Sequence, residues 1–320
     1  MKKGNEALCA RLSVWGKELL VRLGRCAGCG CEESRPAVGR EDGLQILECA
    51  ACGLAYVDPR PSSEQLKEYY SSDYFQVKKD FFHGQDYCQA RDQSVSSGTV
   101  TGYRQITAKL ELEGKSILDV GCGSGALLES LKPHRPARLV GIDVAEHPLE
   151  FGRKRYGLEL TCAALEKAGF AHETFDLLLM IDLIEHVENL PSFLREAMQV
   201  LRPAGKIFVL TPNYEAFRRA GSHWVELHKD FEHLQYFSRS SMAVLAGRAG
   251  LRLVDWWTEG LPVFLRPYPK RWLASLHRFL FPHISAGNLI RRIRYGYLAG
   301  REGGHDLCVI LQKIEGTTRQ

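Results

Sequence analysis

Two closely spaced cysteine pairs near the start of the chain have the spacing of metal ligands. They are Cys26-Ala-Gly-Cys29 and Cys49-Ala-Ala-Cys52, each followed by a glycine that permits a tight turn. Two thiolates from each pair complete a tetrahedral shell of four sulfurs, which suits zinc. A closed shell leaves no position for water, so we expect a structural zinc rather than a catalytic one. Cys31 lies outside the pair spacing and stays a competing ligand.

A glycine-rich turn in the middle of the chain could hold a nucleotide-like cofactor. A buried-looking apolar run over residues 117–120 contains Asp119 and then breaks into Gly121-x-Gly123-x-Gly125. Glycines let a backbone turn tightly and approach a ligand closely, and a helix that starts after them presents free N–H groups. The spacing differs from the G-x-G-x-x-G of dinucleotide-binding proteins, so hydride transfer is not the expected chemistry.

An acid further along strengthens this reading. A second apolar run, over residues 138–143, ends on Asp143, eighteen residues after Gly125. An acid at the tip of the second strand of such a fold accepts hydrogen bonds from the two hydroxyls of a ribose. The glycine turn and this acid together are far more specific than either alone.

Three histidines downstream are candidates for a general base. His186 follows a strongly apolar run, and His228 and His233 lie in a stretch rich in histidine and aromatic residues. A histidine near its ordinary pKa can accept a proton at neutral pH. His233 is a candidate for this base, and His186 is expected to shape the site from a strand end. Tyr236 is equally well explained as a core residue.

The elements that must position these residues follow from hydrophobic patterning. Apolar runs alternate with helical segments, which predicts a doubly wound, mostly parallel sheet whose ligands bind at the carboxyl ends of its strands. The expected strands cover residues 117–120, 138–143, 158–161, 175–181, 206–210, 251–257 and 305–313. Asp119, Asp143, Asp182 and Asn213 all fall at or near such strand ends.

The same patterning divides the chain into four parts. We predict an N-terminal segment over 1–25 with an amphipathic helix at 5–24, a four-cysteine ribbon over 26–61 with strands at 44–48 and 54–57, a helical and aromatic connection over 62–110, and a main domain over 111–320. In the connection, Ser62 is expected to cap a helix, with Glu64 close to a capping arrangement. The aromatic residues of the connection are read as a packing surface or as a lid over the site.

These motifs resemble those of the class I S-adenosylmethionine-dependent methyltransferases. The resemblance covers about residues 100–260 and rests on Leu118-Asp-Val-Gly-Cys-Gly-Ser-Gly125, Val140-Gly-Ile-Asp143, Phe175-Asp-Leu-Leu-Leu179, Asp182-Leu-Ile-Glu-His186 and Leu201-Arg-Pro-Ala-Gly205. It implies an α/β, Rossmann-like doubly wound sheet of seven strands in the order 3-2-1-4-5-7-6, with the last strand antiparallel. It also implies the cofactor-binding residues Asp119, Gly121, Gly123, Gly125, Asp143, Val144, Ala164, Leu165 and Ile181.

Within that resemblance each residue has an expected role. Gly121, Gly123 and Gly125 would pass beneath the methionine part of S-adenosyl-L-methionine, and Asp119 would lie near its amino group. Asp143 would hold the ribose. Ala164 and Leu165 would border the adenine, and Ile181 would line the site after the fourth strand. A four-cysteine ribbon before such a domain is similar to an arrangement in bacterial methyltransferases, some associated with polysaccharide gene clusters and some with ribosomal RNA.

Composition adds a basic segment and bounds the partners. Residues 261–301 contain eight lysines and arginines and no acid, within a chain whose net charge is +4. We read the segment as a solvated insertion, a surface for an anionic membrane or lipid-linked substrate, or a nucleic-acid contact. The chain shows neither a signal peptide nor a transmembrane stretch. We therefore expect a cytoplasmic protein, with peripheral contact at the inner membrane surface through residues 261–301, and no DNA partner.

Three functions are compatible with these observations. The first is methyl transfer to a small-molecule, glycan or lipid-linked acceptor, at oxygen or carbon. The second is methylation of RNA, with the ribbon and the basic segment as the RNA contacts. The third is a non-catalytic protein that keeps the fold and binds the cofactor. The sequence favours the first.

Overall fold

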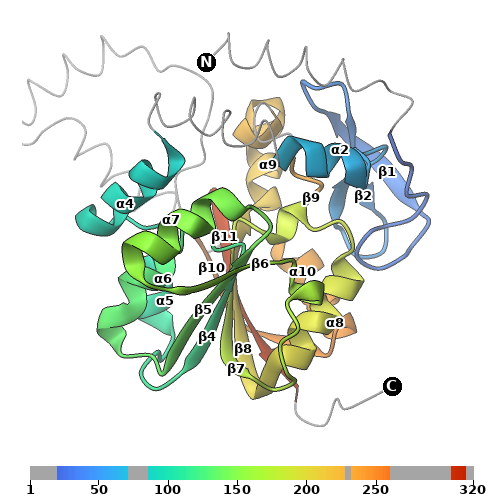
Figure 1. Cartoon of the computed structure of the whole chain (residues 1–320). Helices are drawn as coiled ribbons and strands as arrows, with labels where there is room; N and C mark the ends of the chain where they lie inside the picture. Colours follow the sequence, from blue (N-terminus) through green and yellow to red (C-terminus); the bar gives the residue numbers. More distant parts are fainter. Residues whose placement is uncertain (1–19, 71–85, 228–231, 260–303, 315–320) are drawn as a thin grey trace, which may run out of the picture.

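The computed structural model describes residues 20–70, 86–227, 232–259 and 304–314, and a seven-stranded sheet forms its centre (Figure 1). The strand order is β10-β11-β8-β7-β4-β5-β6. In chain order these are β4 (Ser116–Val120), β5 (Arg138–Asp143), β6 (Glu159–Cys162), β7 (Phe175–Ile181), β8 (Leu201–Pro212), β10 (Leu251–Glu259) and β11 (Asp306–Lys313). Strand β11 alone runs in the opposite direction to the other six strands of this sheet. Counted from β4, this confirms the predicted order 3-2-1-4-5-7-6.

Alternating side chains bury both faces of the sheet. Ile117 and Leu179 belong to one hydrophobic cluster, whereas Leu118 and Met180, their neighbours in sequence, belong to another. This alternation is what a strand covered on both faces requires. Figure 1 shows helices on either side of the sheet. They are α4 (Tyr87–Ser97), α5 (Tyr103–Lys109), α6 (Ala126–Leu131), α7 (Glu146–Tyr156), α8 (Leu190–Val200) and α10 (Arg239–Arg248). Helix α9 (Tyr214–Ala220) packs instead against the cysteine-rich part of the chain.

Short 3₁₀ turns complete the connections around the strands. The turns are η3 (Lys132–His134), η4 (Leu165–Lys167), η5 (Ile184–His186), η6 (Gly221–His223) and η7 (Val225–Leu227). One of them, η5, directly follows β7 at the carboxyl edge of the sheet, where Asp182 adopts a left-handed backbone conformation with φ 48°. A non-glycine residue in that region is strained and is common where a site fixes the backbone.

The cysteine-rich part forms a second, smaller sheet in the order β1-β2-β3-β9. It contains β1 (Ser34–Gly39), β2 (Gln45–Cys49) and β3 (Ala55–Val57), all antiparallel. Its fourth strand, β9 (Gln235–Tyr236), comes from the histidine-rich stretch and pairs with β3. The sheet of the ribbon therefore extends beyond residues 26–61 and includes a strand from the second half of the chain.

Buried polar contacts reinforce this junction. Arg40, in the loop between β1 and β2, pairs with Asp42, and both side chains are fully buried. Its Nη1 donates to the carbonyl of His233 at 2.7 Å and to the Tyr236 hydroxyl at 3.2 Å. The ribbon therefore holds the backbone of His233 from outside the methyltransferase-like sheet. Cys26, Cys49 and Cys52 also belong to the same hydrophobic cluster as α8 and α10.

Several local expectations are corrected. Residues 20–24 of the expected N-terminal helix are not helical, because Val21 forms an antiparallel bridge with Arg60; residues 1–19 lie outside the described part. Helix α2 (Ser63–Glu68) is capped by Ser62, but the reciprocal partner is Gln65 rather than Glu64. The strand expected over 206–210 is longer, since β8 starts at Leu201 directly after α8.

Two further expectations concern membranes and the basic segment. In the described part of the chain, no helix is long and apolar enough to cross a bilayer. Of the basic segment over 261–301, nothing lies within the described residues. Its contact with a membrane, with RNA or with neither therefore stays a prediction from sequence.

Candidate functional site

The glycine turn after β4 adopts a backbone that only glycine tolerates easily. Gly121, Gly123 and Gly125 have φ angles of 76°, 54° and 74°. A side chain at Gly123 would also collide with Tyr87 of α4, whose hydroxyl would lie 2.5 Å from the added Cβ. The turn is therefore pressed against α4, and substitution would cost both strain and a clash. Sequence analysis singled out the glycines but not the role of α4.

The two acids expected around this turn lie beside it. Asp143 ends β5 and accepts hydrogen bonds from the Gly123 N–H at 2.8 Å and from the Ala145 N–H at 2.9 Å. Asp119 is buried in β4 next to it. Burial, and then the charge of Asp143, raise the pKa of Asp119 to about 8, and burial also raises the pKa of Asp143. Two neighbouring acids, one buried and one half-buried, can receive a cationic or hydrogen-bonding ligand.

The remaining predicted cofactor residues lie in different environments. Val144 follows Asp143 and is 63% exposed, whereas Leu165 at the start of η4 is buried and Ala164 is half-buried before it. Ile181, at the end of β7, packs against Gly102, where an added Cβ would lie 3.1 Å from the Ile181 Cδ1 atom. All of them follow strands at the carboxyl edge. Their contacts with a cofactor stay predictions.

A second group of titratable side chains gathers around η5, after β7. His186 of η5 and His233, which precedes β9, have ring centroids 4.7 Å apart in an edge-to-face arrangement. The Tyr70 hydroxyl lies 3.0 Å from His186 Nδ1. The structure thus brings together the two histidines that sequence analysis named as catalytic candidates. The third, His228, lies outside the described residues.

A buried carboxylate that could not be assigned from the sequence lies against His233. Glu226 of η7 is 1% exposed, and its Oε2 lies 3.1 Å from His233 Nδ1. Its Oε1 lies 3.3 Å from Nε2 of His305, which precedes β11. A carboxylate at Nδ1 favours a proton there and leaves Nε2 as the basic nitrogen. The stretch Trp224-Val-Glu-Leu-His228 drew attention for its aromatic and histidine residues, and only the fold identifies the partner of its glutamate.

Glu185 is the third titratable residue of the group that contains His186 and His233. It is fully buried, its Oε2 accepts a hydrogen bond from the Thr211 hydroxyl at 2.9 Å, and burial raises its pKa to about 8. Ligand atoms of Glu185, His186 and His233 all lie within 4.8 Å of one another. One carboxylate and two imidazoles can move a proton or accept a divalent cation. The geometry therefore concentrates acid–base chemistry around η5, at the carboxyl edge of the sheet.

Hydrogen bonds hold residues 233–236, here called the histidine segment, against η5. The Leu234 N–H donates to the Glu185 carbonyl at 2.8 Å. The Gln235 side-chain amide donates to the carbonyls of Ile184 at 2.9 Å and Val187 at 2.7 Å. Since β9 also pairs with β3, His233 is held on one side by the loop after β7 and on the other by the ribbon.

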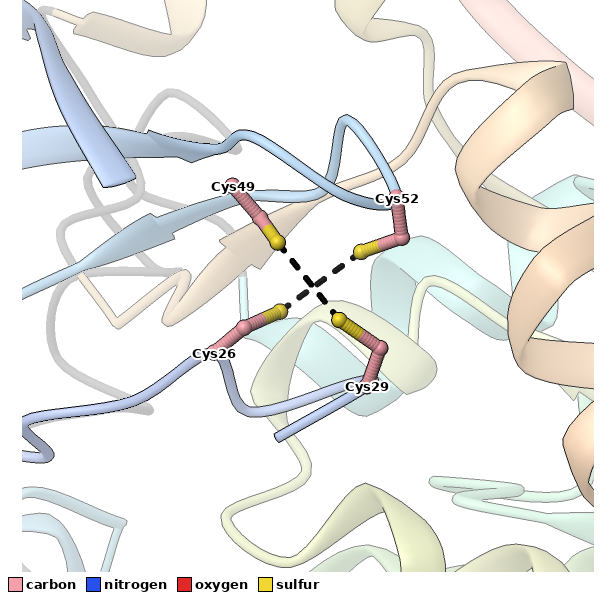
Figure 2. A group of neighbouring side chains, drawn as sticks. All are labelled: Cys26, Cys29, Cys49 and Cys52. Atoms are coloured by element: carbon pink, nitrogen blue, oxygen red, sulfur yellow. Dashed lines mark hydrogen bonds between the residues drawn. The ribbon is translucent and has the colours of Figure 1, made fainter. Parts of the chain in front are cut away.

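The four predicted cysteine ligands converge on one point, as Figure 2 shows. The Sγ atoms of Cys26 and Cys52 lie 3.6 Å apart, and those of Cys29 and Cys49 lie 3.5 Å apart. Ligands about 2.3 Å from a tetrahedral zinc would be separated by about 3.8 Å, so this donor set fits the ion. Cys31 is not part of the group, and its Sγ lies instead against the Glu33 carbonyl.

Strand order, glycine turn and strand-end acids define one class of protein. A seven-stranded sheet with a single antiparallel strand, a glycine turn after its first strand and an acid after its second describe a Rossmann-like methyltransferase domain. Residues 101–255 match the family model described as a methyltransferase domain. The chain therefore contains a class I S-adenosylmethionine-dependent methyltransferase domain.

Individual relatives agree with that family. A ubiquinone biosynthesis O-methyltransferase of Stutzerimonas stutzeri is 33% identical over 38% of this chain and 56% of its own length. One from Coxiella burnetii is 28% identical over 48% of this chain and 70% of its own. The chain thus spans a little over half of the first relative. Among solved structures, a chain in the complex of the Haloferax volcanii Trm112 methyltransferase activator with a methyltransferase shares the fold, with a TM-score of 0.51. The two chains are 14% identical, and the match covers 72% of this chain and 96% of the other.

Proposed function

We propose that this protein transfers a methyl group from S-adenosyl-L-methionine to a hydroxyl oxygen of a small-molecule acceptor. The observation that carries the acid–base part of this proposal is the arrangement of Glu226, His233 and His186 around η5. The acceptor type is supported by the relatives named as O-methyltransferases, which match this chain over part of their length. Glycan and lipid-linked alcohols present the same reacting group and remain within the proposal.

The chain's own residues would then have distinct tasks. When bound, the cofactor supplies an electrophilic methyl group on an excellent leaving group. Gly121 to Gly125 let the backbone pass close to it, and Asp143 accepts hydrogen bonds from its ribose. His233 takes the proton of the acceptor hydroxyl at Nε2 while Glu226 stabilises the resulting imidazolium. Alignment of acceptor and methyl in a near-attack geometry contributes the rest.

The acceptor can be found by following the methyl group. Purified protein is incubated with S-adenosylmethionine carrying a tritiated methyl and with fractionated cell extract, in parallel with the Asp143→Ala variant. We expect label in a small-molecule, glycan or lipid fraction and none with the variant. Label confined to RNA would refute the proposed acceptor class. Cofactor binding with no label in any fraction would support a non-catalytic protein instead.

Asp143→Ala should weaken cofactor binding by about 30-fold or more. The variant removes both acceptors for the ribose hydroxyls and also the anchor of the Gly123 N–H, each a hydrogen bond to a charged group. Isothermal titration calorimetry with S-adenosylhomocysteine measures the effect. Asp255→Ala, which removes an exposed carboxylate paired with Lys109, is the matched control and should leave binding unchanged. Equal affinities for both variants would refute the ribose assignment.

Cofactor affinity should rise with pH through Asp119. Its raised pKa keeps the side chain neutral below about 8 in the free protein, whereas a cationic amino group beside it favours the carboxylate. Binding below pH 8 therefore requires loss of a proton, and affinity should increase about tenfold from pH 6.5 to pH 8. Asp119→Asn should bind more weakly at pH 8 and lose most of this dependence. An unchanged slope in Asp119→Asn would show that another group titrates.

We also propose that the four cysteines bind one structural zinc ion per chain. The convergence of four sulfurs at separations close to those of a tetrahedral shell supports this. Such a site would stabilise a ribbon whose three strands are only three to six residues long.

A further inference from the structure

A groove runs between the first cysteine turn and two helices of the methyltransferase domain. It encloses about 690 Å³ and is bounded by residues 25–30, the start of α8 and the end of α10. That volume is within the range of small-molecule sites. It is separate from the glycine turn, since none of Asp119 to Asp143 lines it.

The groove collects positive charge. Arg25, Arg60, Arg195 and Arg248 line it, against a single acid, Glu188. In the described part of the chain, eight arginines pair with carboxylates, but none of these four does. The start of α8, where Asn189 caps the helix, adds the positive end of a helix dipole.

One of these arginines, Arg60, is half-buried and has one buried, unused donor atom. Arg60 Nη2 donates to the Glu188 carbonyl at 3.0 Å, whereas its Nη1 is buried without a hydrogen-bond partner among the described residues. Burial without full pairing is costly for a guanidinium and lowers the pKa of Arg60. A bound anion would provide the missing acceptor.

The arginines could serve to neutralise the negative charge of a zinc-bound cysteine site, but this would account for only part of their positive charge. Four thiolates around one zinc ion carry a net charge of −2. The four arginines and Glu188 sum to +3, so the groove keeps an excess of positive charge even if the cluster is fully compensated. Guanidinium groups bind phosphate through paired N–H donors, which makes phosphate the best-matched anion.

The wall between the arginines is apolar. Leu23, Leu194 and Leu245 line the groove together with small residues of the cysteine turn. A free phosphate ion would leave this surface unused, whereas a phosphate ester with an apolar chain would cover it. We propose that the groove binds an amphiphilic phosphate ester, with its phosphate on the arginines and its apolar chain along Leu194 and Leu245. This goes beyond methyl transfer and does not depend on the acceptor.

Farnesyl diphosphate is a soluble probe of that chemistry. Its binding to the full-length, zinc-loaded protein is measured by calorimetry beside inorganic pyrophosphate and farnesol. We expect the diphosphate ester to bind at least tenfold more tightly than pyrophosphate, and farnesol not to bind. The double variant Arg195→Ala/Arg248→Ala, at two exposed positions, should weaken ester binding at least tenfold while keeping one zinc per chain.

The matched control removes the same charge elsewhere. Arg104→Ala/Arg252→Ala changes two exposed arginines outside the groove and should bind the ester like the wild type. Three results would overturn the proposal: equal loss in both double variants, no ester binding by the wild type, or loss of zinc in the groove variant. Binding of an RNA oligonucleotide but not of the ester would overturn it as well and assign the charge to nucleic acid.

Discussion

Cys49→Ser is expected to release zinc from the protein and to abolish methyl transfer with it. Removal of one ligand opens the four-sulfur shell, and structural zinc sites contribute roughly 10–16 kcal/mol in small domains. The ribbon forms part of the same hydrophobic cluster as α8 and α10, and its strand β3 pairs with β9 next to His233. Loss of the ribbon should therefore disturb the histidine segment, although the cysteines take no part in the chemistry.

The measurement is zinc content by atomic emission, followed by the rate of methyl transfer and the melting temperature. Cys31→Ser is the matched control, because Cys31 is a neighbouring cysteine outside the group of four. We expect it to retain one zinc per chain and full activity. If Cys49→Ser kept its zinc, the proposed ligand set would be wrong. If it lost zinc but kept its rate, the ribbon would not support the histidine segment.

His233→Ala is expected to reduce kcat by about 10²- to 10⁴-fold, the usual contribution of a general base. Cofactor affinity should stay within about threefold of the wild type, because the cofactor contacts proposed for the glycine turn and Asp143 do not involve the imidazole. His172→Ala is the matched control, since His172 is exposed and precedes β7 at the opposite edge of the sheet. An equal rate for both variants would refute the assignment of His233 as base.

A pH profile separates this role from simple packing. The groups facing His233 are Glu226 at Nδ1, the ring of His186, the buried Glu185 and the Tyr236 ring. The Glu226 carboxylate stabilises a positive charge on the His233 imidazole. Glu226→Gln should therefore move the acidic limb of the kcat profile to lower pH by up to about one unit, with a lower plateau. A lower plateau with no shift would indicate a purely structural effect.

Much of the main sheet could be predicted from the sequence. Strands such as Phe175–Ile181 are uninterrupted apolar runs that belong in a sheet covered on both faces, and Asp143 follows such a run at a fixed distance from the glycines. The cysteine group was equally accessible, because C-x-x-C spacing brings two sulfurs to one point without help from the rest of the fold.

What the sequence could not predict is long-range pairing. Strand β9 has only two residues, and β1 contains Pro36 and ends on Gly39, so neither shows a clear strand pattern. The contacts of Arg40 with His233 and Tyr236 join residues 193 and 196 positions apart. Glu226 lies seven positions before His233 but reaches it only because η7 and β9 are folded against each other.

Strands β3 and β9 pair with each other although the ribosome makes them at very different times. Ala55 of β3 pairs with Tyr236 of β9, 181 residues later in the chain. At roughly 5–20 residues per second, the ribosome would complete the ribbon about 10–40 s before its last strand emerges. During that interval the outer edge of β3 has no partner and is open to pairing with other chains. The nascent protein is therefore expected to be prone to aggregation until residue 236 has emerged and β9 can pair with β3.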